Sequence, residues 1–214
     1  MLSDLLKWGS KRPESAGRDA PAPREEPVVP SKALPKLVAS LSQKEAPVLL
    51  DFGPVIGANV AFCGERLGCK LFIEDLLADV DRHLRGASKE DFVASLETRF
   101  SHPDASIDGI ISWDLFDFLD KNAAAALARQ IVRLLKPGGA VMGFFCTSSV
   151  ERAAFTKFEI VDENTLRHRY HPGVGGRKQS LPNRDIIRMF EGLTVADSFL
   201  LKNNIREILL RKTA

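Results

Sequence analysis

Short apolar runs alternate with helical patterns along the chain from residue 47 onward. Continuous apolar runs predict strands at 48–52, 70–74, 107–113 and 140–146. Between them, apolar residues at helical spacing predict helices at 58–66, 76–84, 89–100 and 122–135. Strands that are apolar on both faces and alternate with helices are typical of a parallel sheet covered by helices. The pattern therefore predicts an α/β domain.

The last third of the chain has a different pattern. Two short strands at 158–161 and 165–170 precede a glycine-rich basic loop, 171–180, and a helix at 183–190 that Asn183 is placed to cap. Strands at 193–202 and 206–211 follow, and Asn203-Asn204 between them favours a chain reversal. We expect an antiparallel hairpin to complete the sheet.

The first 46 residues differ in composition from the rest. Seven of the twelve prolines lie before residue 48, among many charged and small residues. We expect a disordered proline-rich tail, 1–46, followed by a domain, 47–214. Leu2, Leu5, Leu6 and Trp8 give the start of the tail one apolar helical face. This is either a frayed turn or a short helix that touches a membrane surface or a partner.

Composition narrows the choice of environment and partner. The chain has 214 residues, 44% of them hydrophobic, which is enough for one domain with a full core. A net charge of +2 argues neither for nor against nucleic acid as a partner. Three cysteines without CxxC spacing favour a reducing compartment and no structural zinc. There is no apolar run long enough to span a membrane and no signal peptide, so we expect a cytoplasmic protein.

Acidic residues and glycines follow the first two predicted strands. Asp51, Gly53 and Gly57 come after the first strand, and Glu74 and Asp75 end the second just over twenty residues later. Glycines allow a ligand to approach the backbone closely, and a strand-end acid accepts hydrogen bonds from ribose hydroxyls. This arrangement is typical of the first βαβ unit of a nucleotide- or nucleoside-binding sheet.

Over about residues 47–211 the chain resembles the class I S-adenosylmethionine-dependent methyltransferases. The segment Leu49-Leu50-Asp51-Phe52-Gly53-Pro54-Val55-Ile56-Gly57 resembles the first motif of that family. The turn Leu134-Leu135-Lys136-Pro137-Gly138-Gly139 resembles the one before its fifth strand. The resemblance implies a Rossmann-like three-layer sandwich with a mainly parallel, seven-stranded-type sheet that ends in an antiparallel hairpin. It also implies S-adenosylmethionine as the cofactor.

The resemblance further assigns roles to residues at the strand ends. Glu74 would hold the ribose, and Asp75 would share that role or cap the next helix. Gly53 and Gly57 would make room for the cofactor. Asp51 would orient the loop and reach the amino group of the cofactor through water. Trp113 and Asp114 end the fourth strand of the family pattern. Trp113 would lie at the cofactor edge or in the core, and Asp114 is our candidate for orienting the nucleophile or acting as base.

Two features depart from the family pattern. Val55 stands where the family has its middle glycine, and a β-branched residue does not readily take a positive φ, so the loop must follow another path. In place of a third strand ending in an acid, the chain has the helical pattern of 89–100. No adenine-contacting residue is therefore assigned.

Basic residues gather in the C-terminal third. They are Arg167, His168, Arg169, His171, Arg177, Lys178, Arg184 and Arg188. The cluster is either a solvated surface or a receiver for an anionic substrate or a nucleic-acid backbone, although aromatic residues are sparse there. The histidines lack metal-ligand spacing, so we predict no metal site.

Two functions remain open from the sequence. The first is methyl transfer from S-adenosylmethionine to an acceptor that the sequence does not identify. The second, motivated by Val55 and the absent third strand, is a non-catalytic member of the fold that acts as a binding or scaffold module. A nicotinamide-dependent dehydrogenase is set aside because the Gly-x-Gly-x-x-Gly spacing is absent. The sequence does not indicate the oligomeric state.

Overall fold

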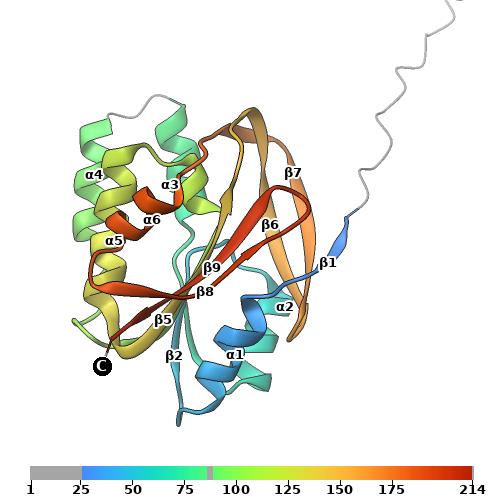
Figure 1. The fold of residues 1–214 in the computed structure, drawn as a ribbon, viewed down its shortest axis with the longest axis vertical. Helices are drawn as coiled ribbons and strands as arrows, with labels where there is room; N and C mark the ends of the chain where they lie inside the picture. Colours follow the sequence, from blue (N-terminus) through green and yellow to red (C-terminus); the bar gives the residue numbers. More distant parts are fainter. Residues whose placement is uncertain (1–25, 86–88, 214) are drawn as a thin grey trace, which may run out of the picture.

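The computed structural model describes residues 26–85 and 89–213. The chain forms a six-stranded sheet with helices on both faces and a separate three-stranded antiparallel sheet (Figure 1). The strands are β1 Val28–Pro30, β2 Val48–Asp51, β3 Lys70–Ile73, β4 Ile107–Trp113, β5 Leu135–Cys146, β6 Val150–Asp162, β7 Thr165–Lys178, β8 Leu193–Leu200 and β9 Ile205–Lys212. The helices are α1 Leu34–Ser42, α2 Gly57–Val60, η1 Ala61–Arg66, α3 Leu76–Leu84, α4 Lys89–Thr98, η2 Leu115–Phe118, α5 Lys121–Leu134 and α6 Asn183–Met189.

The six-stranded sheet has the order β3-β2-β4-β5-β9-β8. The first four strands are parallel, and β9 and β8 are antiparallel additions at one edge. The predicted α/β class and terminal hairpin are confirmed. The seven-stranded arrangement is not found in the described part of the chain, because 89–98 forms α4 where the family has a third strand.

Two apolar cores lie on opposite faces of this sheet. One contains residues of α3, α4, α5 and α6 and the other contains residues of α1, η1 and the β6–β7 hairpin. Figure 1 shows α3 to α6 gathered on one side of the sheet, with α1, α2 and the hairpin on the other. No helix in the described ranges is long and apolar enough to cross a membrane.

The predicted tail is partly wrong. Residues 28–30 pair with β7, and residues 34–42 form α1. Leu34, Leu37 and Leu41 of this helix are buried, because their spacing places all three on the face that packs against the sheet. The domain therefore includes residues that we assigned to the tail, while the predicted N-terminal helix lies outside the described residues.

Other boundaries also move. The predicted glycine-rich loop, 171–180, is largely strand, because β7 runs to Lys178. Asn183 is the first residue of α6 and not its cap, a position taken by Pro182. The Lys136-Pro137-Gly138-Gly139 turn is part of β5 and forms an irregularity in its pairing with β4, with Gly138 at φ 74°.

Candidate functional site

Asp51 is buried at the end of β2, directly before the glycine loop, which comprises residues 52–57. Its Oδ1 accepts a hydrogen bond from the backbone N–H of Gly53 at 2.8 Å and one from Trp113 Nε1 at 2.6 Å. Burial raises the pKa of this carboxyl to about 6, although both hydrogen bonds oppose the shift. Asp51 therefore changes charge close to neutral pH.

Trp113, the last residue of β4, covers one side of the glycine loop. A Cβ added to Gly53 would lie 2.7 Å from the indole Nε1, so the indole fills the space that this glycine leaves open. The ring stacks on Phe158 of β6 with centroids 5.2 Å apart, and only 3% of the residue is exposed. Its backbone has φ 48°, a left-handed conformation that is strained for a bulky residue.

The part of the glycine loop after Gly53 is more exposed than Gly53 itself. Val55 is 72% exposed and is not among the residues with positive φ. The loop therefore follows a path that a β-branched residue can adopt at this position. Gly57 begins α2, and a Cβ at this position would meet no atom within 4 Å. This part of the loop offers open space.

Glu74 and Asp75 follow β3 and differ in what they contact. The backbone N–H of Glu74 donates to the carbonyl of Asp51 at 2.8 Å, which ties the two strand ends together. The Glu74 carboxylate pairs with Arg99 at 3.1 Å and stays partly exposed. Asp75 caps α3 by accepting a hydrogen bond from the Ala78 N–H at 3.2 Å.

Asp114 lies directly after β4 and takes part in a buried ionic cluster. Lys178, at the end of β7, places its Nζ 2.6 Å from Asp114 Oδ2 and 3.6 Å from Asp117 Oδ2. The three side chains are 14%, 4% and 2% exposed, in the order Lys178, Asp114, Asp117. The second carboxylate oxygen of Asp114, Oδ1, is buried and has no hydrogen-bond partner in the described part of the chain.

Asp117 joins this cluster to the end of β5. Both of its carboxylate oxygens accept from the backbone N–H of Cys146, at 3.0 and 3.1 Å. Burial raises the pKa of Asp117 to about 7; Lys178 lowers it and Asp114 raises it. Burial likewise raises the pKa of the Cys146 thiol to about 12, which favours the protonated thiol over the thiolate.

Comparison with known proteins gives a family match over part of this domain. Residues 50–143, which run from β2 to the middle of β5, match a family described as a methyltransferase domain. This match agrees with the resemblance to S-adenosylmethionine-dependent methyltransferases over the same strands. No curated protein sequence matches the chain.

Two solved structures of low sequence identity share the fold of this domain with TM-scores of 0.50. The CcbJ methyltransferase of Streptomyces caelestis is 14% identical with a TM-score of 0.50, over 85% of this chain and 94% of the other. The PH0226 protein of Pyrococcus horikoshii OT3 is also 14% identical with a TM-score of 0.50, over 85% and 89% of the two chains. A 1,6-didemethyltoxoflavin-N1-methyltransferase of Burkholderia thailandensis is 17% identical with a TM-score of 0.49, over 85% and 79%.

Within this methyltransferase fold, the candidate residues meet at one edge of the sheet. Asp51, Glu74 and Asp114 follow neighbouring parallel strands, β2, β3 and β4, so they lie at the carboxyl edge where open α/β sheets bind ligands. Sequence reasoning missed two residues of this region. Lys178 was placed only in the basic cluster and was not paired with Asp114, and Asn59 of α2 was not singled out.

Asn59 connects the glycine-loop helix to the hairpin. Its Nδ2 donates to the carbonyl of Phe158 at 2.9 Å, and its Oδ1 accepts from the Ile160 N–H at 2.7 Å. The buried amide thus pairs with the backbone of β6 on both sides of one residue. Asn59 lies within the helix predicted at 58–66, but the sequence does not indicate its hydrogen-bond partners, which lie 99 and 101 residues away.

The predicted basic cluster is largely paired with acids. Arg167 and Arg169 both contact Glu159, Arg177 contacts Glu151 at 3.3 Å, and Lys178 is buried against Asp114. These pairs neutralise part of the positive surface. Nucleic-acid binding stays a prediction.

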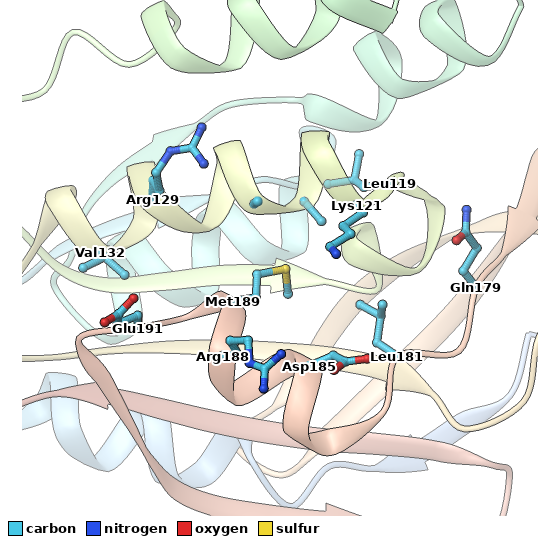
Figure 2. Close-up of a pocket in the computed structure, with 12 residues that line it drawn as sticks. Leu119, Lys121, Arg129, Val132, Gln179, Leu181, Asp185, Arg188, Met189 and Glu191 are labelled. Carbon is cyan, nitrogen blue, oxygen red and sulfur yellow. The ribbon is translucent and has the colours of Figure 1, made fainter.

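Two cavities of the described structure lie away from the strand ends. One of about 710 Å³ is a groove between α5 and α6, and Figure 2 shows Lys121 and Arg129 on one wall and Arg188 and Met189 on the other. The second, of about 450 Å³, lies between α4 and α5. Neither is lined by Asp51, Glu74 or Asp114. Within the described residues, no group of three or more His, Cys, Asp or Glu side chains is arranged to hold a metal ion.

Proposed function

We propose that this chain transfers a methyl group from S-adenosylmethionine to a nucleophilic acceptor at the carboxyl edge of β3, β2 and β4. The observation that carries the proposal is the meeting of three acids, Glu74, Asp51 and Asp114, at the ends of three neighbouring parallel strands. Ligands of open α/β sheets bind at this edge. The family match covers all three strand ends.

The residues around the glycine loop suit the cofactor. Glu74 would accept hydrogen bonds from the ribose hydroxyls, and Asp75 stands beside it as the cap of α3. Asp51 would attract the amino group, while Gly53 and Gly57 would let the ligand approach the backbone. Trp113 borders the same space. When bound, S-adenosylmethionine supplies an electrophilic methyl group on a sulfonium.

Asp114 is the residue that we assign to the acceptor. Lys178 holds its Oδ2, and the buried Oδ1 has no hydrogen-bond partner in the described part of the chain. Oδ1 would therefore accept a hydrogen bond from an N–H or O–H of a nucleophile that reaches this buried position. Such a contact orients the nucleophile and takes up its proton. Methyl transfer is an in-line displacement in which positioning supplies most of the catalysis.

A second candidate is a non-catalytic binding module with the same fold. The observation in its favour is the indole of Trp113, which fills the space over Gly53 that a cofactor would use. The two candidates differ in a simple property, because a scaffold that keeps this indole in place does not bind the cofactor.

Equilibrium dialysis of the full chain against S-adenosylmethionine, with NAD as the control ligand, tests the proposal. We expect saturable binding of S-adenosylmethionine and none of NAD. Absence of saturable binding to the folded protein would contradict methyl transfer and favour the binding module.

With any acceptor that supports release of S-adenosylhomocysteine, Asp114→Asn should lower the rate at least about 100-fold, the usual contribution of a positioned acid or base.

A further inference from the structure

Trp113 occupies the position of a ligand at the glycine loop. Its indole N–H donates to Asp51 Oδ1 at 2.6 Å, beside the Gly53 N–H that donates to the same oxygen. Its ring also covers Gly53, where a single added carbon would approach Nε1 to 2.7 Å. The loop in this form therefore contacts part of its own protein with both its carboxylate and its glycine.

The indole N–H of Trp113 is a hydrogen-bond donor, like the ammonium group that Asp51 is suited to bind. An N–H donor on a buried carboxylate satisfies the same acceptor that an ammonium group would use. Because both donors need Asp51, an indole that stays in place and a ligand that reaches this carboxylate exclude one another.

The backbone of Trp113 is in a conformation that favours a change of state. A bulky residue at φ 48° is strained and persists only where its surroundings hold it. Here the hydrogen bond to Asp51 and the stack on Phe158, with the rings 6° from parallel, hold it. Phe158 is in turn fixed to α2 through Asn59.

We propose that Trp113 is an internal competitor of the cofactor, whose indole leaves Asp51 and Gly53 when the methionine end of S-adenosylmethionine or S-adenosylhomocysteine binds. The residue thereby sets the affinity for the cofactor. The inference rests on the proposed function. It differs from a simple contact role in the sign of its effect, because removing a contact weakens binding whereas removing a competitor strengthens it.

The test uses the full-length chain with Trp8→Phe, which leaves Trp113 as the only tryptophan of the two in the sequence. Calorimetric titration with S-adenosylhomocysteine gives the dissociation constant for this protein and for the same protein with Trp113→Phe. Phenylalanine keeps an aromatic ring against Phe158 and lacks the N–H. We expect binding to tighten by about tenfold, the cost of one hydrogen bond to a charged acceptor.

Fluorescence of the Trp8→Phe protein gives a second reading of the same event. Emission from Trp113 should shift to longer wavelength as S-adenosylhomocysteine saturates the site, because the indole leaves a buried stack. Calorimetric binding with unchanged emission, or an affinity that is equal or weaker in Trp113→Phe, would overturn the inference and leave the proposed function standing. If neither protein binds, both fail; if only Trp113→Phe binds, the competitor role is supported.

A second variant keeps the test valid if Trp113→Phe does not fold. Phe158→Leu removes the stacking partner and should also tighten binding, by several-fold. Phe155→Leu is the matched control, because Phe155 lies on the same strand but packs against Phe118 in the other core. Equal affinities in these two variants would contradict the proposal.

Discussion

Asp51 is buried, and burial disfavours the charged form that this carboxyl adopts near neutral pH. Its pKa is raised from 3.8 to about 6, chiefly by burial. A carboxyl with a raised pKa stabilises the fold fully below pH 4, and this contribution is lost as the pH rises to about 6. Asp51→Asn keeps an oxygen acceptor for Gly53 and Trp113 and removes the titration.

We therefore expect Asp51→Asn to raise the free energy of unfolding above pH 7 by about 1–3 kcal/mol. At pH 4 the two proteins should be nearly equal in stability. Urea denaturation at pH 4 and pH 8 measures both differences. Affinity for S-adenosylmethionine should fall at least about tenfold, the equivalent of one charge-assisted hydrogen bond. Parallel stability curves for the two proteins would show that Asp51 does not titrate in this range.

Lys178 is the cation that offsets the charge of the two buried carboxyl groups of the cluster, Asp114 and Asp117. Lys178→Met leaves Asp114 and Asp117 buried without a positive partner, so we expect a loss of about 3–5 kcal/mol in the free energy of unfolding. Arg177→Met is the matched control, because its ion pair with Glu151 is exposed; its effect should stay within about 0.5 kcal/mol. Urea titrations compare the two variants, and adding Asp114→Asn to Lys178→Met should recover part of the loss.

Individual residues of the site were predictable only where local sequence marks them. Asp51 and Glu74 stand where an apolar strand ends, and the parallel sheet then brings them to one edge. Lys178 gave no such sign, since its partner Asp114 is 64 residues away and neighbouring arginines are surface residues. Trp113 ends β4 and lies in a buried core cluster, one of the two places expected, but its hydrogen bond to Asp51 depends on a left-handed backbone that a sequence pattern does not reveal.

Among the elements, the contact between α2 and the β6–β7 hairpin depends on Asn59. Asn59→Ala removes both hydrogen bonds to β6 and leaves the Phe158 carbonyl and the Ile160 N–H unpaired in the core. The expected cost is about 1–3 kcal/mol in the free energy of unfolding. Amide hydrogen exchange should speed up at Ile160 and along β6. Asn164→Ala, at the exposed turn of the same hairpin, should leave this exchange unchanged; equal exchange in both variants would contradict the role of Asn59.

The elements that the sequence pattern missed share a cause. Prolines at 27, 30 and 35 suggested a tail, yet Pro30 ends a short strand of the small sheet and Pro35 lies in the first turn of α1, where proline is tolerated. Glycines at 173, 175 and 176 suggested a loop, yet Gly175 pairs with Ala154 in β7 and β6. A Cβ at Gly175 would lie 2.1 Å from the Ala153 carbonyl oxygen, so here glycine serves close strand packing.

At the scale of the whole molecule, the sheet keeps the part of the methyltransferase fold that forms the candidate site. The parallel order β3-β2-β4-β5 is intact and the terminal hairpin β8–β9 is present. In the described part of the chain, β3 is the edge strand opposite the hairpin, and α4 lies where the family pattern has its third strand. The apolar runs predicted parallel strands but not their order; β4 is buried along its whole length, whereas the edge strand β3 is only partly buried.

The central claim, a cofactor site at this edge, is tested most directly by calorimetric titration of S-adenosylhomocysteine into the wild-type chain and Glu74→Ala. The control is Glu97→Ala, which also removes a carboxylate paired with an arginine, Arg129, but lies on α4. We predict saturable binding to wild type and Glu97→Ala, weakened at least about tenfold in Glu74→Ala. Equal affinity in all three proteins, or no binding by the folded wild type, would contradict the account.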